Sequence, residues 1–242
     1  MAPTDTTDRH LVLVGVGPGI GRSVACLFAS KRYNNITLIS RRAEQLKIEQ
    51  AEVEVAARPR PVKVRTYAVD VADSGALSDA LVDAETAFGK PECVYFNAAR
   101  VIPSQLLNHD VKEIEYDFRL TVSALYVTAQ WAMPSLQDLA KVDTSAQPAL
   151  VVTGGVLHVE PDPKLFALRG AGVLLDFGIA WTKPHFRWAA LPEFQKKDDH
   201  RLDEIRFREI IDQLGLDYNI RGTPNSDYKE KLRKNNRKSY QR

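Results

Sequence analysis

The stretch "HLVLVGVGPGIGRSVA" (residues 10–25) decides the fold, because an apolar run leads directly into four glycines and then into a helical pattern. The apolar run is continuous, which is typical of a parallel strand buried on both faces. Beyond the glycines, apolar residues recur at the spacing of one helix face, at Ile20, Val24, Leu27 and Phe28. A glycine-rich turn between strand and helix lets the backbone approach a pyrophosphate, and the helix N-terminus attracts the anion. We therefore expect a phosphate-binding loop in this first strand–helix unit.

The same alternation of strand and helix patterns continues along the chain. Apolar runs typical of strands occupy residues 10–16, 34–40, 62–71, 92–99 and 148–155. Helix-like patterns occupy residues 20–28, 41–57, 74–90, 109–133 and 166–181, and Asp73 is placed to cap the third of them. Strand–helix–strand units joined by right-handed crossovers build a doubly wound parallel sheet. We therefore expect a Rossmann-like α/β fold, formed as a single dinucleotide-binding domain by residues 1–181.

The pattern changes after Thr182, where no further strand-like run is expected. One amphipathic helix is predicted at residues 203–216, and the chain ends in the strongly basic stretch "YKEKLRKNNRKSYQR" (228–242). A segment with few apolar residues and a high charge does not bury enough surface to fold by itself. We therefore expect residues 182–242 to form a divergent, polar and partly disordered tail.

The composition excludes several classes of protein. The chain has 242 residues, with 33 basic and 31 acidic side chains, so its net charge of +2 gives no reason to expect nucleic acid binding. Its two cysteines, Cys26 and Cys93, lie in separate apolar stretches, so we expect reduced thiols and no metal site. The first ten residues are polar and do not resemble a signal peptide. No apolar run approaches the roughly 18 residues of a membrane span, so we expect a cytoplasmic protein.

The spacing of the glycines selects between two dinucleotide fingerprints. The pattern G-x-G-x-x-G fails from Gly15, because Ile20 stands where its last glycine is required. The pattern G-x-x-x-G-x-G fits at Gly15, Gly19 and Gly21. Since this pattern lies between a predicted strand and a predicted helix, we expect it to hold the pyrophosphate of a dinucleotide.

The end of the second predicted strand indicates which dinucleotide is bound. NAD-selective sites place Asp or Glu there to bind the ribose 2′-hydroxyl. This chain has Ser40, Arg41 and Arg42, and its first acid in this region is Glu44. A guanidinium matches a 2′-phosphate in charge and in bidentate geometry. The sequence therefore predicts NADP(H) as the cofactor.

Four stretches together resemble the short-chain dehydrogenase/reductase family: "GVGPGIG" (15–21), "SRR" (40–42), "VDV" (69–71) and "NAA" (97–99). Their order and spacing match that family over residues 10–181. The resemblance implies that the glycine loop, including Ile20, cradles the pyrophosphate and that Ser40 with Arg41 meets the 2′-phosphate. It also implies that Asp70 lies beside the adenine and that Asn97 and Ala98 lie along the cofactor.

The catalytic part of the family pattern is altered. Family catalysis uses a Ser and a Tyr-x-x-x-Lys pair, and none of the eight tyrosines is followed by Lys four residues later. The expected helix has Phe166 and Gly170, or in another register Leu168 and Gly172, at the Tyr and Lys positions. The Ser position falls near Thr153 and the family Asn near Thr121. The candidate catalytic residues are therefore Thr153 and His158, with Lys164 a further substitute.

Three hypotheses for the function follow. The first is an NADP(H)-dependent oxidoreductase acting on a carbonyl or alcohol of a small organic substrate, including secondary metabolites. The second is a catalytically degenerate pseudoenzyme that binds NADP(H) or a partner protein. The third is a truncated family member whose tail arose from an altered reading frame. The resemblance also implies a homo-oligomer that associates through helices 109–133 and 166–181.

Overall fold

Six parallel strands form one sheet in a computed structural model that describes residues 8–104, 107–154 and the backbone of 186–190. The strands are β1 His10–Val14, β2 Asn35–Ser40, β3 Lys63–Ala68, β4 Cys93–Phe96, β5 Ala149–Gly154 and β6 Phe186–Ala190. Their order is β3-β2-β1-β4-β5-β6, and every neighbouring pair is parallel. The chain therefore winds outward from β1 to β3 and then returns to build the other half from β4. This confirms the expected doubly wound α/β fold.

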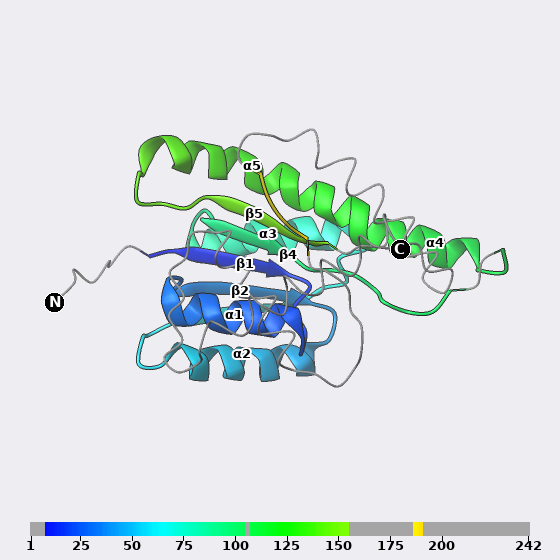
Figure 1. The fold of residues 1–242 in the computed structure, drawn as a ribbon, viewed down its shortest axis with the longest axis horizontal. Helices are drawn as coiled ribbons and strands as arrows, with labels where there is room; N and C mark the ends of the chain where they lie inside the picture. Colours follow the sequence, from blue (N-terminus) through cyan, green and yellow to red (C-terminus); the bar gives the residue numbers. More distant parts are fainter. Residues whose placement is uncertain (1–7, 105–106, 155–185, 191–242) are drawn as a thin grey trace, which may run out of the picture. The chain divides into compact units, whose positions relative to one another are not determined.

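Helices cover both faces of the sheet. They are α1 Ile20–Lys31, α2 Ala43–Ala57, α3 Ser74–Phe88, α4 Val111–Phe118 and α5 Ala124–Val142, with a π-helical turn η1 at Arg119–Ser123. Helix α1 packs against α2, and α3 packs against α5. Figure 1 shows α1 and α2 on one side of the sheet and α5 on the other. This two-sided cover is the arrangement that βαβ crossovers of one hand produce.

Strand burial explains why the sequence patterns differ between strands. Every residue of β1 and β4 is buried, and β2 is buried up to its last residue, as expected for inner strands covered on both faces. The edge strand β3 instead has no fully buried residue, and its exposure alternates over its first four residues. On the α3 and α5 face, Val12, Val14 and Phe96 join a continuous apolar core with Leu77 and Leu81 of α3. Burying each such side chain contributes roughly 1.5–3 kcal/mol.

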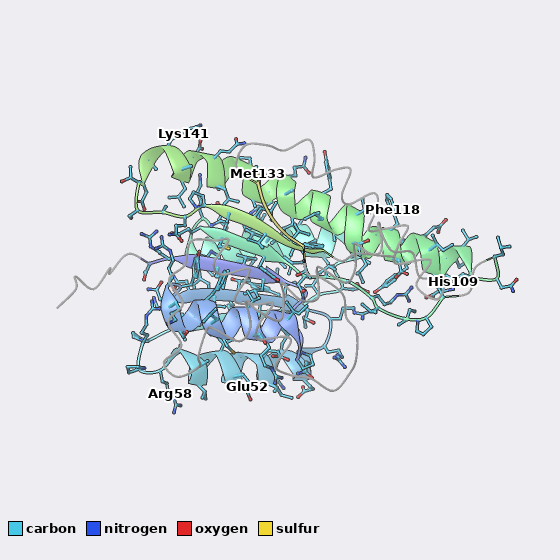
Figure 2. The ribbon with its side chains drawn as sticks, viewed as in Figure 1. Glu52, Arg58, His109, Phe118, Met133 and Lys141 are labelled. Atoms are coloured by element: carbon cyan, nitrogen blue, oxygen red, sulfur yellow. The ribbon has the colours of Figure 1, made fainter. Side chains whose placement is uncertain are left out.

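The expected helix at 109–133 is longer and less regular than its sequence pattern. It runs from Val111 to Val142 as α4, η1 and α5 in succession, and it passes through Pro134. Phe118, Met133 and Lys141 mark this helix in Figure 2. A proline inside a helix costs about 3 kcal/mol. Burial of Ala132 and Leu136 on either side of Pro134 offsets that cost, so the helix does not end there.

The expectation that no strand follows Thr182 is wrong at Phe186–Ala190. This segment forms β6 and pairs with β5, from Leu150 with Phe186 to Gly154 with Ala190. The strand has five residues, "FRWAA", and Arg187 interrupts its apolar sequence. Its pattern therefore gives no clear sign of a strand. Pairing with the open edge of β5 specifies the strand more than its own side-chain pattern does. The domain boundary at 181 and the remaining residues of the predicted tail lie outside the described part of the chain.

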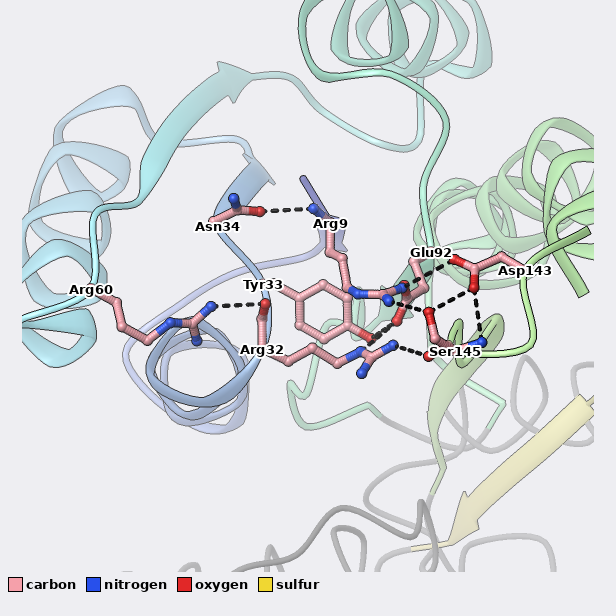
Figure 3. Close-up of polar contacts among 8 residues, drawn as sticks. All are labelled: Arg9, Arg32, Tyr33, Asn34, Arg60, Glu92, Asp143 and Ser145. Carbon is pink, nitrogen blue, oxygen red and sulfur yellow. Dashed lines mark hydrogen bonds and ion pairs between the residues drawn. The ribbon is translucent and has the colours of Figure 1, made fainter. Parts of the chain in front are cut away.

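A buried ionic cluster ties the amino-terminal ends of the strands together (Figure 3). The Glu92 carboxylate binds the guanidinium groups of Arg9 and Arg32, with 2.6 Å between Arg32 Nε and Glu92 Oε1. Arg9 also donates to the Ser145 hydroxyl at 2.8 Å, and Arg32 donates to the Ser145 carbonyl at 2.7 Å. Arg9 precedes β1, Glu92 precedes β4 and Ser145 precedes β5. The cluster therefore lies at the amino-terminal ends of the strands, whereas the glycine loop lies at their carboxyl ends.

Candidate functional site

The predicted site residues gather at the carboxyl ends of the parallel strands. Gly15 follows β1, Ser40 ends β2, Asp70 follows β3, Asn97 follows β4 and Thr153 lies at the end of β5. The strand order reverses between β1 and β4, and ligands of doubly wound sheets bind at such a switch point. Residues from five separate stretches are thus brought to one edge of the sheet.

The glycine loop is held close to the sheet at its two ends. Gly15 has φ of +90°, and a Cβ built there would lie 2.5 Å from the backbone nitrogen of Ala98. A Cβ on Gly21 would lie 3.0 Å from the Cα of Val16. The Gly15 and Val16 amides both donate to the Ile39 carbonyl, at 2.9 and 3.1 Å. These contacts require glycine at position 15, leave little room for a side chain at Gly21, and fix the loop between β1 and β2.

The middle of the loop has open space beside its two glycines. A Cβ built on Gly17 or Gly19 would meet no heavy atom within 4 Å. Helix α1 begins at Ile20 without a side-chain cap and has no acid in its first turn. The first N–H groups of an α-helix have no partner within the helix and carry its positive dipole end. The loop therefore has the space and the donors that a pyrophosphate requires.

Asn97 connects the glycine loop to the end of β5. Its Nδ2 donates to the Gly15 carbonyl at 3.0 Å, and its Oδ1 accepts from the Thr153 hydroxyl at 2.7 Å. The adjacent Ala98 touches Gly15 through its backbone. Both residues therefore lie directly beside the glycine loop.

The Thr153 hydroxyl has a second hydrogen-bond partner, which the sequence did not indicate. Its Oγ1 lies 2.9 Å from the hydroxyl of Tyr95, which is fully buried on β4. Burial raises the pKa of Tyr95 to about 12, so its phenol keeps its proton at neutral pH. Because a hydroxyl has one proton, a Thr153 that donates to Asn97 accepts from Tyr95. Tyr95 thus supplies a proton donor to the residue at the family's Ser position.

The arginines near the loop differ in whether a carboxylate neutralises them. Arg22 is bound by Glu49, with 2.6 Å between Nε and Oε2, and Arg100 is bound by Asp117 at 2.7 Å. Arg41 and Arg42 follow β2 and are exposed, and neither pairs with a carboxylate in the described part of the chain. The side chain of Arg41 instead donates to the hydroxyl of Tyr116 at 2.8 Å. Positive charge is therefore available where the sequence predicts the 2′-phosphate.

Asp70 is fixed by two donors at the end of β3. The Tyr116 hydroxyl donates to its carboxylate at 2.8 Å, and the Ala72 amide donates at 3.1 Å. Tyr116 comes from α4, so this contact brings the long helix to the adenine side of the predicted site. The hydroxyls of Tyr95 and Tyr116 were not predicted as part of the site, because only the fold brings β4 to β5 and α4 to β3.

The remaining catalytic candidates are only partly described. Thr121, at the family's Asn position, is buried within η1 and donates to the Asp117 carbonyl at 2.6 Å. His158, Lys164 and the helix predicted at 166–181 lie outside the described residues. Among the residues that the structure does describe, no group of three or more His, Cys, Asp or Glu side chains could hold a metal ion. None of the described helices is long and apolar enough to cross a membrane.

Comparison with known proteins finds a family to which the chain is similar. A family model described as short chain dehydrogenase matches residues 9–146, which is more than half of the chain. Two relatives are uncharacterized oxidoreductases, one from Mycobacterium tuberculosis at 26% identity and one from Staphylococcus aureus at 25%. The alignments cover 54% and 56% of this chain, and 48% and 55% of the respective relatives. The chain therefore spans about half the length of the curated relatives it matches.

Solved structures share the fold at low sequence identity. An alcohol dehydrogenase from the archaeon Thermococcus sibiricus, complexed with 5-hydroxy-NADP, matches with a TM-score of 0.72 and 17% identity. That match covers 89% of this chain and 94% of the other. The NADH-dependent reductase A1-R′ complexed with NAD matches with a TM-score of 0.69 and 16% identity, covering 85% and 88%. Since one neighbour holds an NADP derivative and the other NAD, fold likeness does not choose between the cofactors.

Proposed function

The chain belongs to the short chain dehydrogenase family, and on that premise we propose that it binds NADP(H) and is an oxidoreductase acting on a carbonyl or alcohol of a small organic molecule. The observation that carries the cofactor preference is the Arg41 and Arg42 pair after β2. Both side chains are exposed, and no carboxylate in the described ranges neutralises them. A ribose 2′-phosphate would offer these guanidinium groups an opposite charge and a bidentate acceptor, whereas the 2′-hydroxyl of NAD(H) offers a single neutral oxygen.

The residues present fit a dinucleotide along its length. The open backbone at Gly17 and Gly19 and the uncapped start of α1 would hold the pyrophosphate. Asp70 would lie on the adenine side, and Asn97 and Ala98 beside the part of the cofactor nearer β5. When bound, the nicotinamide supplies or accepts the hydride, which is chemistry that the protein itself does not perform.

The chain must then hold the reacting oxygen and provide a proton. Thr153 lies at the end of β5, and its hydroxyl can turn from Asn97 toward a substrate oxygen at the cost of one hydrogen bond. Its contact with Tyr95 stays in place during that rotation. His158, which follows in the chain, is the second candidate, since an imidazole exchanges protons near neutral pH. We propose Thr153 for hydrogen bonding to the substrate and His158 for proton transfer.

The first test is a calorimetric titration of the full chain with NADPH and NADH. We expect NADPH to bind more tightly, and Arg41→Asp to weaken NADPH binding by about tenfold or more while changing NADH binding less than about twofold. The matched control is Arg58→Asp, which removes an exposed arginine at the far end of α2 and should change neither affinity. Equal losses for both cofactors in the Arg41 variant would contradict the proposed preference.

Turnover is tested separately from binding. Carbonyl and alcohol substrates are screened by NADPH absorbance with the native chain, with Thr153→Val and with His158→Gln. We expect both substitutions to lower turnover without lowering NADPH affinity. A chain that binds NADPH and turns over none of the compounds would favour the alternative of a catalytically degenerate NADP(H)-binding protein.

We also propose that the chain forms homo-oligomers through its long helix. Phe118 of α4 and Tyr126 of α5 are 41% and 68% exposed, which places large apolar surface on the outside of that helix. The other predicted contact, residues 166–181, lies outside the described residues. Sedimentation velocity of the full chain tests this proposal, and a monomer at micromolar concentration would contradict it.

A further inference from the structure

Tyr116 joins the two charged groups at the adenosine end of the candidate site. Its hydroxyl accepts from Arg41 Nη1 at 2.8 Å and lies 2.8 Å from Asp70 Oδ2 and 3.1 Å from Asp70 Oδ1. A phenol hydroxyl has one proton, and a carboxylate can only accept, so the proton of Tyr116 goes to Asp70. Burial, with the hydrogen bond to Asp70 as the next cause, raises the pKa of Tyr116, so the phenol remains protonated at neutral pH.

The ring of Tyr116 is itself held in place. The Arg100 guanidinium lies over it, 4.8 Å from the ring centroid. Arg100 is anchored in turn by Asp117, at 2.7 Å, and by Glu113, both on α4. Arg100 is therefore neutralised by acids of the same helix and serves to fix the tyrosine. Arg41 differs from Arg100, because it contacts Tyr116 by donating a hydrogen bond to the neutral hydroxyl.

We propose that Tyr116 is a positioning residue that sets the preference for a 2′-phosphate by keeping the Arg41 guanidinium off the Asp70 carboxylate. Without the hydroxyl, Arg41 and Asp70 lose the group that now contacts both of them, and they can form a direct ion pair. That pair would use the guanidinium edge and the charge that a 2′-phosphate needs. The hydroxyl therefore keeps two opposite charges close to one ligand without letting them neutralise each other. This inference rests on the proposed function, in which Arg41 receives the phosphate.

The test uses two adenosine ligands that differ only at the 2′ position, adenosine 2′,5′-bisphosphate and adenosine 5′-monophosphate. Calorimetry on the full chain measures the ratio of their dissociation constants. We expect Tyr116→Phe to lower the preference for the bisphosphate by about tenfold, with the affinity for the monophosphate changed less than about twofold. The thermal unfolding midpoint, measured in parallel, shows whether the variant is folded.

A double-mutant cycle separates positioning from a structural role. If Tyr116 acts through Arg41, then Tyr116→Phe in an Arg41→Ala background changes the preference by less than about twofold. Adding Asp70→Asn to Tyr116→Phe should restore part of the preference, because the amide no longer attracts the guanidinium. The matched control is Tyr67→Phe, which removes a hydroxyl that donates to Asp83 at 3.0 Å and should leave the ratio unchanged.

The outcomes distinguish a failure of the 2′-phosphate assignment from a failure of the role proposed for Tyr116. A native chain that binds both adenosine ligands equally overturns the 2′-phosphate assignment and this inference with it. A native chain that prefers the bisphosphate, with a folded Tyr116→Phe variant that keeps that preference, overturns this inference alone. Additive losses in the double variant would assign Tyr116 a role independent of Arg41. If Tyr116→Phe does not fold, Asp70→Asn with Tyr116 intact must keep the preference for the bisphosphate, because the hydroxyl already holds the guanidinium off the carboxylate, and a loss of that preference overturns the inference.

Discussion

At Gly15 the main chain has φ of +90° and passes so close to the segment after β4 that a built Cβ would lie 2.5 Å from Ala98 N. Two separate requirements therefore meet in one residue, since a left-handed φ and close backbone contact both exclude a side chain. The Gly15 carbonyl also accepts from Asn97, which in turn binds Thr153. A shift at Gly15 would therefore be transmitted to the end of β5.

We expect Gly15→Ala to destabilise the protein by about 2 kcal/mol or more, because the new Cβ is strained by φ and overlaps Ala98. NADPH affinity should fall as well, since the loop is displaced. Urea unfolding measures the first effect and calorimetry the second. Gly17→Ala is the matched control, because a Cβ there meets nothing within 4 Å, and its stability should change by less than about 0.5 kcal/mol. Equal destabilisation of the two variants would contradict the close packing of Gly15.

Between elements, the ionic cluster at the amino-terminal ends of the strands supports the sheet from the side opposite the site. The side chain of Glu92 is 4% exposed and that of Arg9 is also 4% exposed, so both charges are buried. A buried pair adds little net stability over apolar packing, yet breaking it leaves one charge without its partner. The cluster therefore fixes the relative positions of β1, β4 and the turn before β5 (Figure 3).

We expect Glu92→Gln to cost about 3 kcal/mol, because Arg32 loses its carboxylate and the buried Arg9 loses its nearer one while keeping that of Asp143 at 3.7 Å. The free energy of unfolding in urea measures this loss. The same substitution at Glu44, which is 84% exposed and pairs with Lys47, should cost less than about 1 kcal/mol. Cofactor affinity should change little in folded Glu92→Gln, since the cluster lies at the far edge of the sheet. A loss at Glu92 no larger than that at Glu44 would show that the cluster contributes no more than a surface pair.

For the whole molecule, stability should depend on pH through His10. This residue is 2% exposed, and its ring nitrogens contact the Gly89 carbonyl at 2.7 Å and the Thr37 hydroxyl at 2.9 Å. Burial, opposed in part by the hydrogen bond to Gly89, lowers the pKa of His10 from 6.5 to about 4. The folded state therefore resists protonation more than the unfolded state does. This contribution to stability is complete above about pH 6.5 and is lost as the pH falls toward 4.

We expect the native protein to lose about 3 kcal/mol between pH 7 and pH 4 through this one group. His10→Gln removes the titration, so its unfolding free energy should fall less steeply over the same interval, although its stability at pH 7 is lower. Urea unfolding at half-unit pH steps measures both slopes, and the carboxylates common to both proteins cancel in the difference. Parallel slopes would exclude His10 as a source of the pH dependence.

The elements that the sequence predicted best are those in which local pattern and burial agree. The continuous apolar run before Gly15 became β1, and Asp73 caps α3 by accepting from the amides of Gly75 and Ala76. The continuation of helix α5 beyond Pro134 was not predicted, because the packing of Leu136 outweighs the local helix-breaking effect of proline. Strand β6 was missed because its five residues take their conformation from the edge of β5.

The candidate site divides in the same way. Glycines after a strand, arginines after the next and an acid after the third can be read from spacing, because parallel strands end at a common edge. Tyr95 and Tyr116 could not be found in this way, since their partners are distant in the sequence. Tyr95 meets Thr153 across 58 positions, and Tyr116 meets Asp70 across 46.

By itself, the sequence determined the α/β class, the glycine loop and the strand ends that carry the candidate cofactor residues, because periodicity and backbone requirements are local properties. Only the tertiary structure decided which arginines remain unneutralised and which hydroxyls meet the site. Arg22 and Arg100 are equally basic in the sequence, yet Glu49 and Asp117 neutralise them. The state of a charge depends on which groups the fold places within a few ångströms of it, and separation along the chain does not determine that distance.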